Sequence, residues 1–197
     1  MAKAFIHPKS DVSKNSMVGE GSKVWSGAFI REHARIGKNC IIGSNAYIDH
    51  DVQVGDNVKI QNNCLIYYMT ILENGVFIGP GVIITNDKMP RAIDENGRLK
   101  TASEWKAETT KIMEGASVGA GSVLLPGIKI GKFSLVGAGS VVTKDVEDFS
   151  IVYGNPAKKR GYLCRCGSKK VSLPEIKKHP KISCKKCKSE ITIKTAK

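Results

Sequence analysis

Four cysteines near the end of the chain have a spacing that suits a metal ion. They form two short-spaced pairs, Cys164 with Cys166 and Cys184 with Cys187, and seventeen residues separate the pairs. Two turns that each present two thiolates complete the closed tetrahedral site that zinc occupies in zinc ribbons. The first pair is CxC where CxxC is commoner, and a redox pair is the alternative interpretation. The spacing favours structural zinc.

The segment around these cysteines carries nearly all of the net charge. From Lys158 to Lys197 there are 14 Lys and Arg against two acids, which is +12 of the total of +13. The preceding 157 residues carry 17 basic and 16 acidic groups and have no electrostatic reason to attract a polyanion. We therefore expect two domains, residues 1–160 and 161–197. The second is too small to fold on apolar burial alone, so zinc would supply its stability.

Polar residues of a different kind gather in and before an irregular stretch, residues 85–111. They are Gln61, Asn62, Asn63, Tyr67, Tyr68, Asn86 and Arg91. A long excursion from a regular structure is usually functional or disordered, because it forgoes regular packing. Amide and phenol groups suit a polar small molecule, and a guanidinium suits a diphosphate or a carboxylate. Outward polar decoration of surface turns is the alternative.

A six-residue repeat in the sequence predicts the strands and turns that must position these side chains. Every sixth residue from Ile6 to Ile84 is aliphatic, fourteen in a row, and the same period resumes from Ile112 to Val142. Small residues recur two positions earlier and glycines just after, as in short strands joined by sharp turns, with three strands to a coil of about 18 residues. Each aliphatic residue then packs on those one coil away. One such ladder should contain Ile6, Val24, Ile42, Ile60 and Ile78.

This pattern resembles the left-handed parallel β-helix acyltransferases. The expected fold is therefore all-β, a left-handed parallel β-helix of hexapeptide repeats with a loop at 85–111, followed by a small C-terminal zinc ribbon. Some hexapeptide β-helices are carbonic anhydrases or purely structural proteins. An anhydrase needs a histidine triad on adjacent coils, which the histidines of this chain do not supply: His7, His33, His50 and His179.

The sequence near the loop is similar to that of one branch of these acyltransferases, which N-acylates amino groups of nucleotide-linked sugars. The similarity covers roughly residues 4–162 and rests on segments 59–63, 75–80 and 85–91. It implies that Asn86 holds the sugar amine, with Gln61, Asn62, Asn63, Tyr67, Tyr68 and Arg91 as substrate-binding residues. A neutral amide leaves the amine lone pair free to attack a thioester, and the departing coenzyme A thiolate can accept the proton. A turn-forming asparagine is the alternative for Asn86.

A histidine base is the main alternative mechanism, because many other hexapeptide acyltransferases use one. His50 lies between Asp49 and Asp51, which favour a charged surface imidazolium. His33 follows an internal aliphatic residue by three positions, at an expected corner. Either histidine remains a candidate.

We expect the acyl donor to bind along a strip of exposed backbone that carries almost no side chains. Segments 115–122 and 135–140 stack one coil apart, and such a strip of backbone can hydrogen-bond an extended pantetheine arm as if it were another strand. The residues expected to contact acetyl-CoA or another acyl-CoA are Gly119, Ala120, Gly137, Ala138, Lys158 and Arg160. The resemblance implies that the two basic residues meet phosphate, and a solvated charge run is the alternative.

We therefore expect an acyl-CoA-dependent N-acyltransferase, with acetyl as the first candidate group, acting on a nucleotide-linked amino sugar. The resemblance implies a homotrimer. The rival hypothesis is a non-catalytic β-helix scaffold whose basic zinc tail contacts nucleic acid. Against it, Tyr162 is almost the only aromatic residue among the basic residues of that tail that could stack on bases. The chain has neither an apolar stretch of the roughly 18 residues that a membrane span requires nor a signal-like N-terminus, so the cytoplasm is the expected location.

Overall fold

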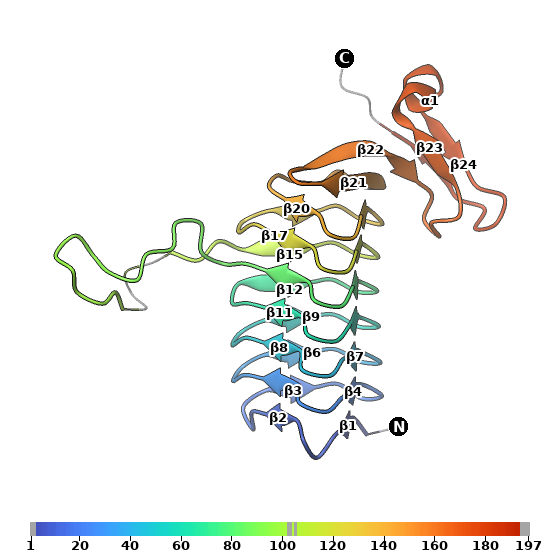
Figure 1. Ribbon diagram of the computed structural model, residues 1–197. Coiled ribbons are helices and arrows are strands. Elements are labelled where there is room, and N and C mark those ends of the chain that lie inside the picture. Colours follow the sequence, from blue (N-terminus) through green and yellow to red (C-terminus); the bar gives the residue numbers. More distant parts are fainter. Residues whose placement is uncertain (1–2, 102–103, 105, 194–197) are drawn as a thin grey trace.

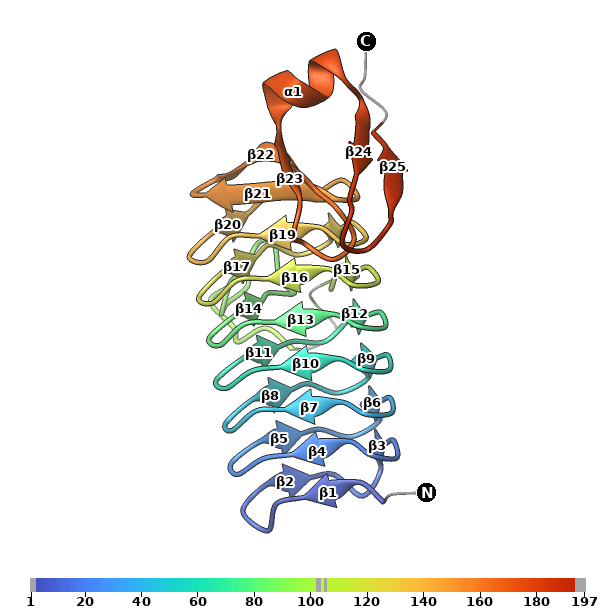
Figure 2. The ribbon, with the colours of Figure 1, turned by 90° about the vertical axis from the view of Figure 1, so that its right-hand side faces the viewer.

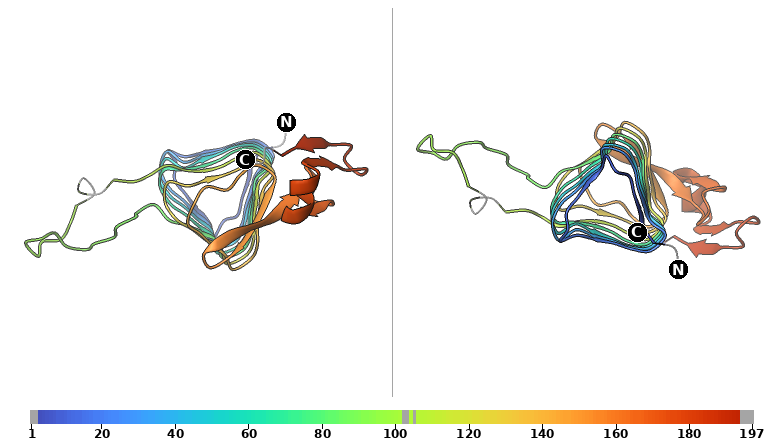
Figure 3. Two further views of the ribbon diagram at one scale, coloured as in Figure 1. Left: turned by 90° about the horizontal axis from the view of Figure 1, so that it is seen from above. Right: turned by 90° about the horizontal axis from the view of Figure 1, so that it is seen from below.

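The computed structural model describes residues 3–101, 104 and 106–193. Over this range the chain winds into a solenoid of triangular cross-section (Figures 1 and 3), whose sides we name sheets A, B and C. Three predicted ranges have parts outside the described residues, namely 1–2 of the first expected domain, 102, 103 and 105 of the loop, and 194–197 of the second expected domain. The all-β, coiled architecture predicted from the repeat is confirmed.

Each complete coil adds one strand to each sheet, and most of the strands have two residues. Sheet A contains β1 (Phe5–Ile6), β4 (Lys23–Val24), β7 (Ile41–Ile42), β10 (Lys59–Ile60), β13 (Phe77–Ile78), β16 (Ser117–Val118), β19 (Leu135–Val136), β21 (Ser150–Gly154), β22 (Ala157–Leu163) and β23 (Lys170–Ser172). Sheet B contains β2 (Asp11–Val12), β5 (Phe29–Ile30), β8 (Tyr47–Ile48), β11 (Leu65–Ile66), β14 (Ile83–Ile84), β17 (Val123–Leu124) and β20 (Val141–Val142). Sheet C contains β3 (Met17–Val18), β6 (Arg35–Ile36), β9 (Gln53–Val54), β12 (Thr70–Leu72), β15 (Thr110–Ile112) and β18 (Lys129–Ile130).

The predicted aliphatic ladder is present in register. In sheet A the partners along parallel strands are Ile6, Val24, Ile42, Ile60 and Ile78. The last four are fully buried, because each is covered by a coil above and a coil below. Ile6 is 44% exposed, since it belongs to the first coil.

Small residues occupy the inside of the corners, where the chain turns between sheets. Cys40 is fully buried there, and its thiol lies 3.1 Å from the carbonyl oxygen of Gly55. Ser22, one coil earlier, donates from its hydroxyl to Gly37 O in the same way, at 2.7 Å. Burial raises the pKa of the thiols of Cys40 and Cys64, so both remain protonated core groups.

The corners of successive coils stack into three edges, named A–B, B–C and C–A after the sheets they join. The loop leaves the B–C edge after β14 and returns at β15. Thr110, the first residue of β15, is buried and pairs with Thr70 of β12. The excursion therefore ends at residue 109, two residues earlier than the sequence predicted, because Thr110 and Lys111 already belong to the ladder.

The C-terminal segment closes the solenoid and then forms a second small core. β21 and β22 make an antiparallel hairpin, and β22 continues into pairing with β23, so the expected boundary at residue 160 falls inside β22. Beyond it lie α1 (Leu173–Lys178) and the two-stranded sheet of β24 (Lys181–Ser183) and β25 (Glu190–Thr192). No helix in the described residues is long and apolar enough to cross a bilayer.

The loop and the C-terminal segment project from opposite sides of the solenoid. The view along the axis shows the loop on one side and α1 with β23–β25 on the other (Figure 3). Figure 2 shows the same segment stacked over the last coils, with the N-terminus at the opposite end. Any function of the loop within one chain is therefore separate from the C-terminal segment.

Candidate active site

The B–C edge carries a column of polar residues directly below the loop. Register between adjacent strands of sheet B places Glu32, His50, Tyr68 and Asn86 at equivalent positions on successive coils. The imidazole of His50 stacks on the ring of Tyr68, with 4.3 Å between centroids. Thr85 still follows the coil, since its amide donates to Leu124 O, so Asn86 lies at the point where the loop departs.

A buried carboxylate holds this column in place. Asp49 is 6% exposed, and its Oδ1 accepts from Arg31 Nη1 at 3.0 Å, from the Tyr47 hydroxyl at 3.1 Å and from the His50 amide at 2.8 Å. Its Oδ2 accepts from the amide of Tyr68 at 3.1 Å. Asp49 thereby ties three coils together and fixes the backbone under the stacked rings of His50 and Tyr68. These four hydrogen bonds offset the cost of removing the carboxylate from water.

The pKa values of Arg31 and Tyr47, which both bond to Asp49, are raised. Hydrogen bonding to Tyr47 and to Glu32 raises the pKa of Arg31 still further, so the guanidinium stays charged. Burial raises the pKa of the Tyr47 phenol, which therefore keeps the proton it donates to Asp49. The sequence analysis named Asp49 only as a neighbour of His50 and missed its burial and its bonds to Arg31 and Tyr47. The only signal in the sequence was an acidic residue directly after an inward-facing isoleucine.

His50 also forms a histidine–carboxylate pair. Its Nδ1 lies 2.8 Å from Oδ2 of Asp51, and its side chain is 31% exposed. A carboxylate at one ring nitrogen fixes the tautomer and leaves the other nitrogen for a proton, which is the arrangement of a general base. His33 is exposed at a corner with a φ of 62°. Of the two histidines considered from the sequence, His50 has the better geometry.

The loop encloses a hollow that brings two predicted residues together. This loop hollow has a volume of about 460 Å³ and is lined by Asn86, Asp87, Met89, Arg91, Ala92, Leu99, Lys100 and Thr101. An ion pair between Lys88 and Glu108, 2.8 Å apart, joins the two ends of the loop. An amide and a guanidinium thus line one hollow, and Asn86 belongs both to this hollow and to the column.

The structure does not bring all predicted acceptor residues to one place. Tyr67 and Tyr68 lie on the B–C edge with the loop, but Gln61, Asn62 and Asn63 lie on the A–B edge, because one strand and one corner separate the two groups. Asn62 has a role in the coil stack, since its Oδ1 accepts from the Ser44 amide at 2.9 Å. Asn63 adopts the left-handed corner conformation, with a φ of 58°.

The A–B edge also carries the smooth strip. Ala120 and Ala138 are exposed there at equivalent positions of adjacent coils. A Cβ at Gly119 would overlap the backbone nitrogen of Ala138, and one at Gly137 would lie 2.7 Å from Tyr153 Cβ, so the stacking of coils requires both glycines. The absence of larger side chains among these described residues leaves bare backbone at the edge.

The hairpin of β21 and β22 ends above this strip. Tyr153 follows Val152, which pairs with Val136, and the Gly154 amide donates to Ser140 Oγ at 3.2 Å. Lys158 pairs with Tyr153 across the hairpin, and the Arg160 guanidinium lies 5.1 Å from the centre of the Tyr153 ring. Two exposed cations therefore lie near the C-terminal end of the strip.

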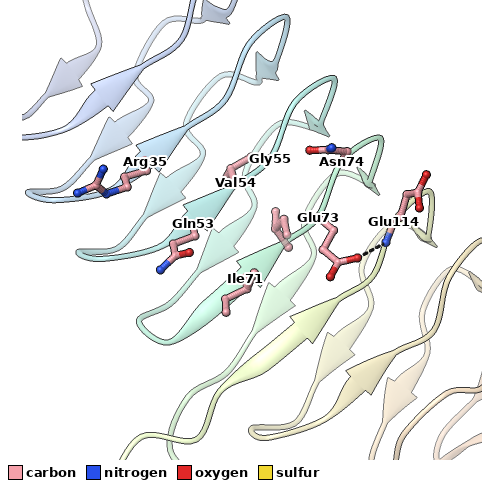
Figure 4. A pocket seen from close by; sticks show the side chains of 9 residues that line it. Arg35, Gln53, Val54, Gly55, Ile71, Glu73, Asn74 and Glu114 are labelled. Atoms are coloured by element: carbon pink, nitrogen blue, oxygen red, sulfur yellow. Dashed lines mark hydrogen bonds between the residues drawn. The ribbon is translucent and has the colours of Figure 1, made fainter.

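A separate hollow of about 400 Å³ lies on the outer face of sheet C, and it is lined by none of the predicted site residues (Figure 4). Its two carboxylates are already engaged. Glu73 accepts from the Glu114 amide at 2.9 Å and pairs with Lys111 at 2.8 Å, and the Glu114 carboxylate lies 3.7 Å from the ammonium of Lys132. The hydrogen bond from Lys111 lowers the pKa of Glu73. This sheet C hollow is explained by contacts between neighbouring coils.

Comparison with known proteins finds the same repeat. A family model described as bacterial transferase hexapeptide (six repeats) matches residues 33–67 and 109–144. This match covers less than half of the chain, and it agrees with the six-residue repeat and with the coiled fold.

Its relatives act on amino sugars and other small molecules. The dTDP-3-amino-3,6-dideoxy-alpha-D-galactopyranose 3-N-acetyltransferase of Aneurinibacillus thermoaerophilus is 53% identical over 60 residues, 30% of this chain and 31% of that protein. A chloramphenicol acetyltransferase of Klebsiella aerogenes is 50% identical over 54 residues, 27% of this chain and 26% of that protein. PerB from Caulobacter crescentus, solved with CoA and GDP-perosamine, aligns with a TM-score of 0.51 and 28% identity over 81% of this chain and 58% of that one. The chain thus matches under a third of the length of the Aneurinibacillus and Klebsiella proteins.

Proposed function

We propose that the protein transfers an acyl group, with acetyl as the first candidate, from a coenzyme A thioester to the amino group of a nucleotide-linked amino sugar. The observation that carries this proposal is that Asn86 and Arg91 both line the loop hollow, while Asn86 also belongs to the column that contains His50 and Tyr68. An amide can orient an amine there, while a guanidinium binds an anionic group such as a diphosphate. The amino-sugar activity named for the Aneurinibacillus relative supports the same substrate class.

The reaction needs a neutral amine and a proton acceptor. The amine nitrogen attacks the thioester carbonyl carbon, the carbon–sulfur bond breaks, and an amide and coenzyme A thiol result. Asn86 orients the amine by hydrogen bonding, and the departing thiolate takes the proton. The alternative is that His50, oriented by Asp51, accepts the proton as a general base.

The assay for this activity is release of free thiol from acetyl-CoA in the presence of a panel of amino-sugar nucleotides. We expect thiol release that depends on both the acyl donor and an amino-sugar nucleotide. If no acceptor in the panel causes thiol release, and the protein binds nucleic acid with an affinity that falls steeply with salt, the scaffold hypothesis is supported instead.

The donor is proposed to lie along the strip at the A–B edge, with its phosphates near Lys158 and Arg160. Ala138→Leu is expected to raise the KM for acetyl-CoA about tenfold, a loss of about 1.4 kcal/mol of binding, because a large side chain would obstruct the strip. Ser26→Leu is the matched control, since Ser26 holds the equivalent position on an early coil of the same edge. Equal KM values for the two variants would contradict a donor site on this strip.

The proposed acceptor and donor sites lie on different edges of one chain, and sheet B separates them. We infer that a second copy supplies the missing half, so that the loop of one chain faces the strip of its neighbour in a homotrimer. Sheet B supports such packing, because its outward residues form an apolar ladder: Phe29, Tyr47, Leu65, Ile83, Val123 and Val141.

Light scattering of the pure protein at micromolar concentration is expected to give about three times the 21.3 kDa of one chain. A fully active monomer would contradict the shared site. The cytoplasmic location expected from the sequence stays a prediction, which cell fractionation would check.

A further inference from the structure

The C-terminal segment brings four cysteines together. The sulfur atoms of Cys164, Cys166, Cys184 and Cys187 all lie within 4.8 Å of one another, and all four residues are free thiols. They come from two turns, one after β22 and one after β24. Cys164 and Cys184 are buried, Cys187 is half-buried and Cys166 is exposed.

The distances fit tetrahedral coordination. Zinc–sulfur bonds of about 2.3 Å in a tetrahedron place neighbouring sulfurs about 3.8 Å apart. The Sγ of Cys166 lies 3.5 Å from that of Cys164 and 3.9 Å from that of Cys184. Carboxylate or imidazole ligands are not part of the cluster, and an all-sulfur donor set favours zinc over the hard cations.

The two turns have matching backbone conformations. A residue in the left-handed region follows the second cysteine of each pair, Gly167 with a φ of 74° and Lys188 with a φ of 53°. Each turn is closed by a bond from the amide of its first cysteine, to Lys169 O at 2.9 Å and to Ser189 O at 3.0 Å. The Lys169 amide also donates to Cys164 Sγ at 3.3 Å, as amides do toward thiolate ligands.

From these observations we propose that Cys164, Cys166, Cys184 and Cys187 bind one structural zinc ion. The apolar core around them is small, with Tyr162, Ile176, Ile182 and Ile193 as its other buried members among the described residues. A core of this size needs a further constraint to hold one conformation. Metal coordination supplies it, because it ties the turn after β22 to the turn after β24.

The same ion fastens the segment to the solenoid. Arg165 lies between the first two ligands, and its guanidinium is 4.8 Å from the centre of the Phe133 ring and 4.0 Å from Glu114 Oε1. Because the flanking cysteines fix the backbone on both sides of Arg165, coordination holds the guanidinium against the C–A edge. The ion therefore orders and docks the segment at a distance from the loop, and the solenoid fold does not depend on it.

The test is the zinc content of the purified, reduced protein. We expect about one zinc per chain in the wild type, loss of that zinc in Cys184→Ser, and no loss in Cys40→Ser. Cys40 is the matched control because it is a buried cysteine inside the solenoid, at a position where Ser22 makes the same contact one coil earlier. A wild-type protein that takes up no zinc from excess metal, or a Cys184→Ser variant with full zinc content, would overturn the proposal.

A second measurement separates metal binding from folding. Removal of zinc by a chelator should leave the circular dichroism of the solenoid unchanged and should speed proteolysis within residues 161–193. Arg165→Ala should keep the zinc and still speed that cleavage. Unfolding of the solenoid together with zinc loss would contradict a purely local role, and unchanged cleavage in both cases would contradict docking through the metal.

Discussion

Asn86→Ala is expected to lower turnover about thirtyfold while leaving the KM for acetyl-CoA nearly unchanged. The amide is proposed to contact the acceptor and not the donor, and an oriented hydrogen bond lost from the reacting amine costs on the order of 2 kcal/mol. Steady-state kinetics with both substrates varied would separate the two constants. Asn96→Ala is the control, because Asn96 belongs to the same loop and is not among the residues that line the loop hollow.

The same experiment decides between the two proton acceptors. If thiolate accepts the proton, His50→Ala should retain much of its activity, since the ring then takes no part in proton transfer. If Asn86→Ala is nearly as active as the wild type while His50→Ala or His33→Ala is inactive, the thiolate mechanism is wrong and a histidine acts as the base.

The solenoid was predictable because its period is a physical requirement repeated in every coil. A residue such as Ile42 must match the aliphatic residues one coil away on both sides, so the pattern recurs without exception and the ladder could be read directly from the chain. The small residues that recur two positions before the aliphatic ones include Cys40 and Cys64, and both are buried.

The edges were harder to predict than the coils. Gln61 and Tyr67 are six residues apart and share a coil, yet the turn between them places them on different edges. Asp49 was equally hidden, because a carboxylate at a corner is usually solvated, and only the positions of Arg31, Tyr47 and Tyr68 on neighbouring strands explain its burial. Side-chain contacts between coils are not encoded by spacing within one coil.

In the C-terminal segment, too, local features could be predicted from the sequence and long-range contacts could not. The two cysteine pairs were recognisable because each pair is a local turn. The contact of Arg165 with Glu114 and Phe133 was not, since it depends on how the segment packs against a coil some 30 to 50 residues earlier in the chain.

Ile60→Ala is expected to lower the free energy of unfolding by about 2–5 kcal/mol, the usual cost of removing a fully buried isoleucine side chain. Ile60 lies in the middle of the sheet A ladder, between Ile42 and Ile78, where no rearrangement of a single coil can fill the cavity. Ile6→Ala is the matched control, because Ile6 belongs to the same ladder but is 44% exposed at its end, and it should cost about 1 kcal/mol or less. Urea unfolding followed by circular dichroism would measure both. Because solenoid stability is a sum of coil and neighbour terms, equal losses at the two positions would mean that stability is not set by burial along this ladder.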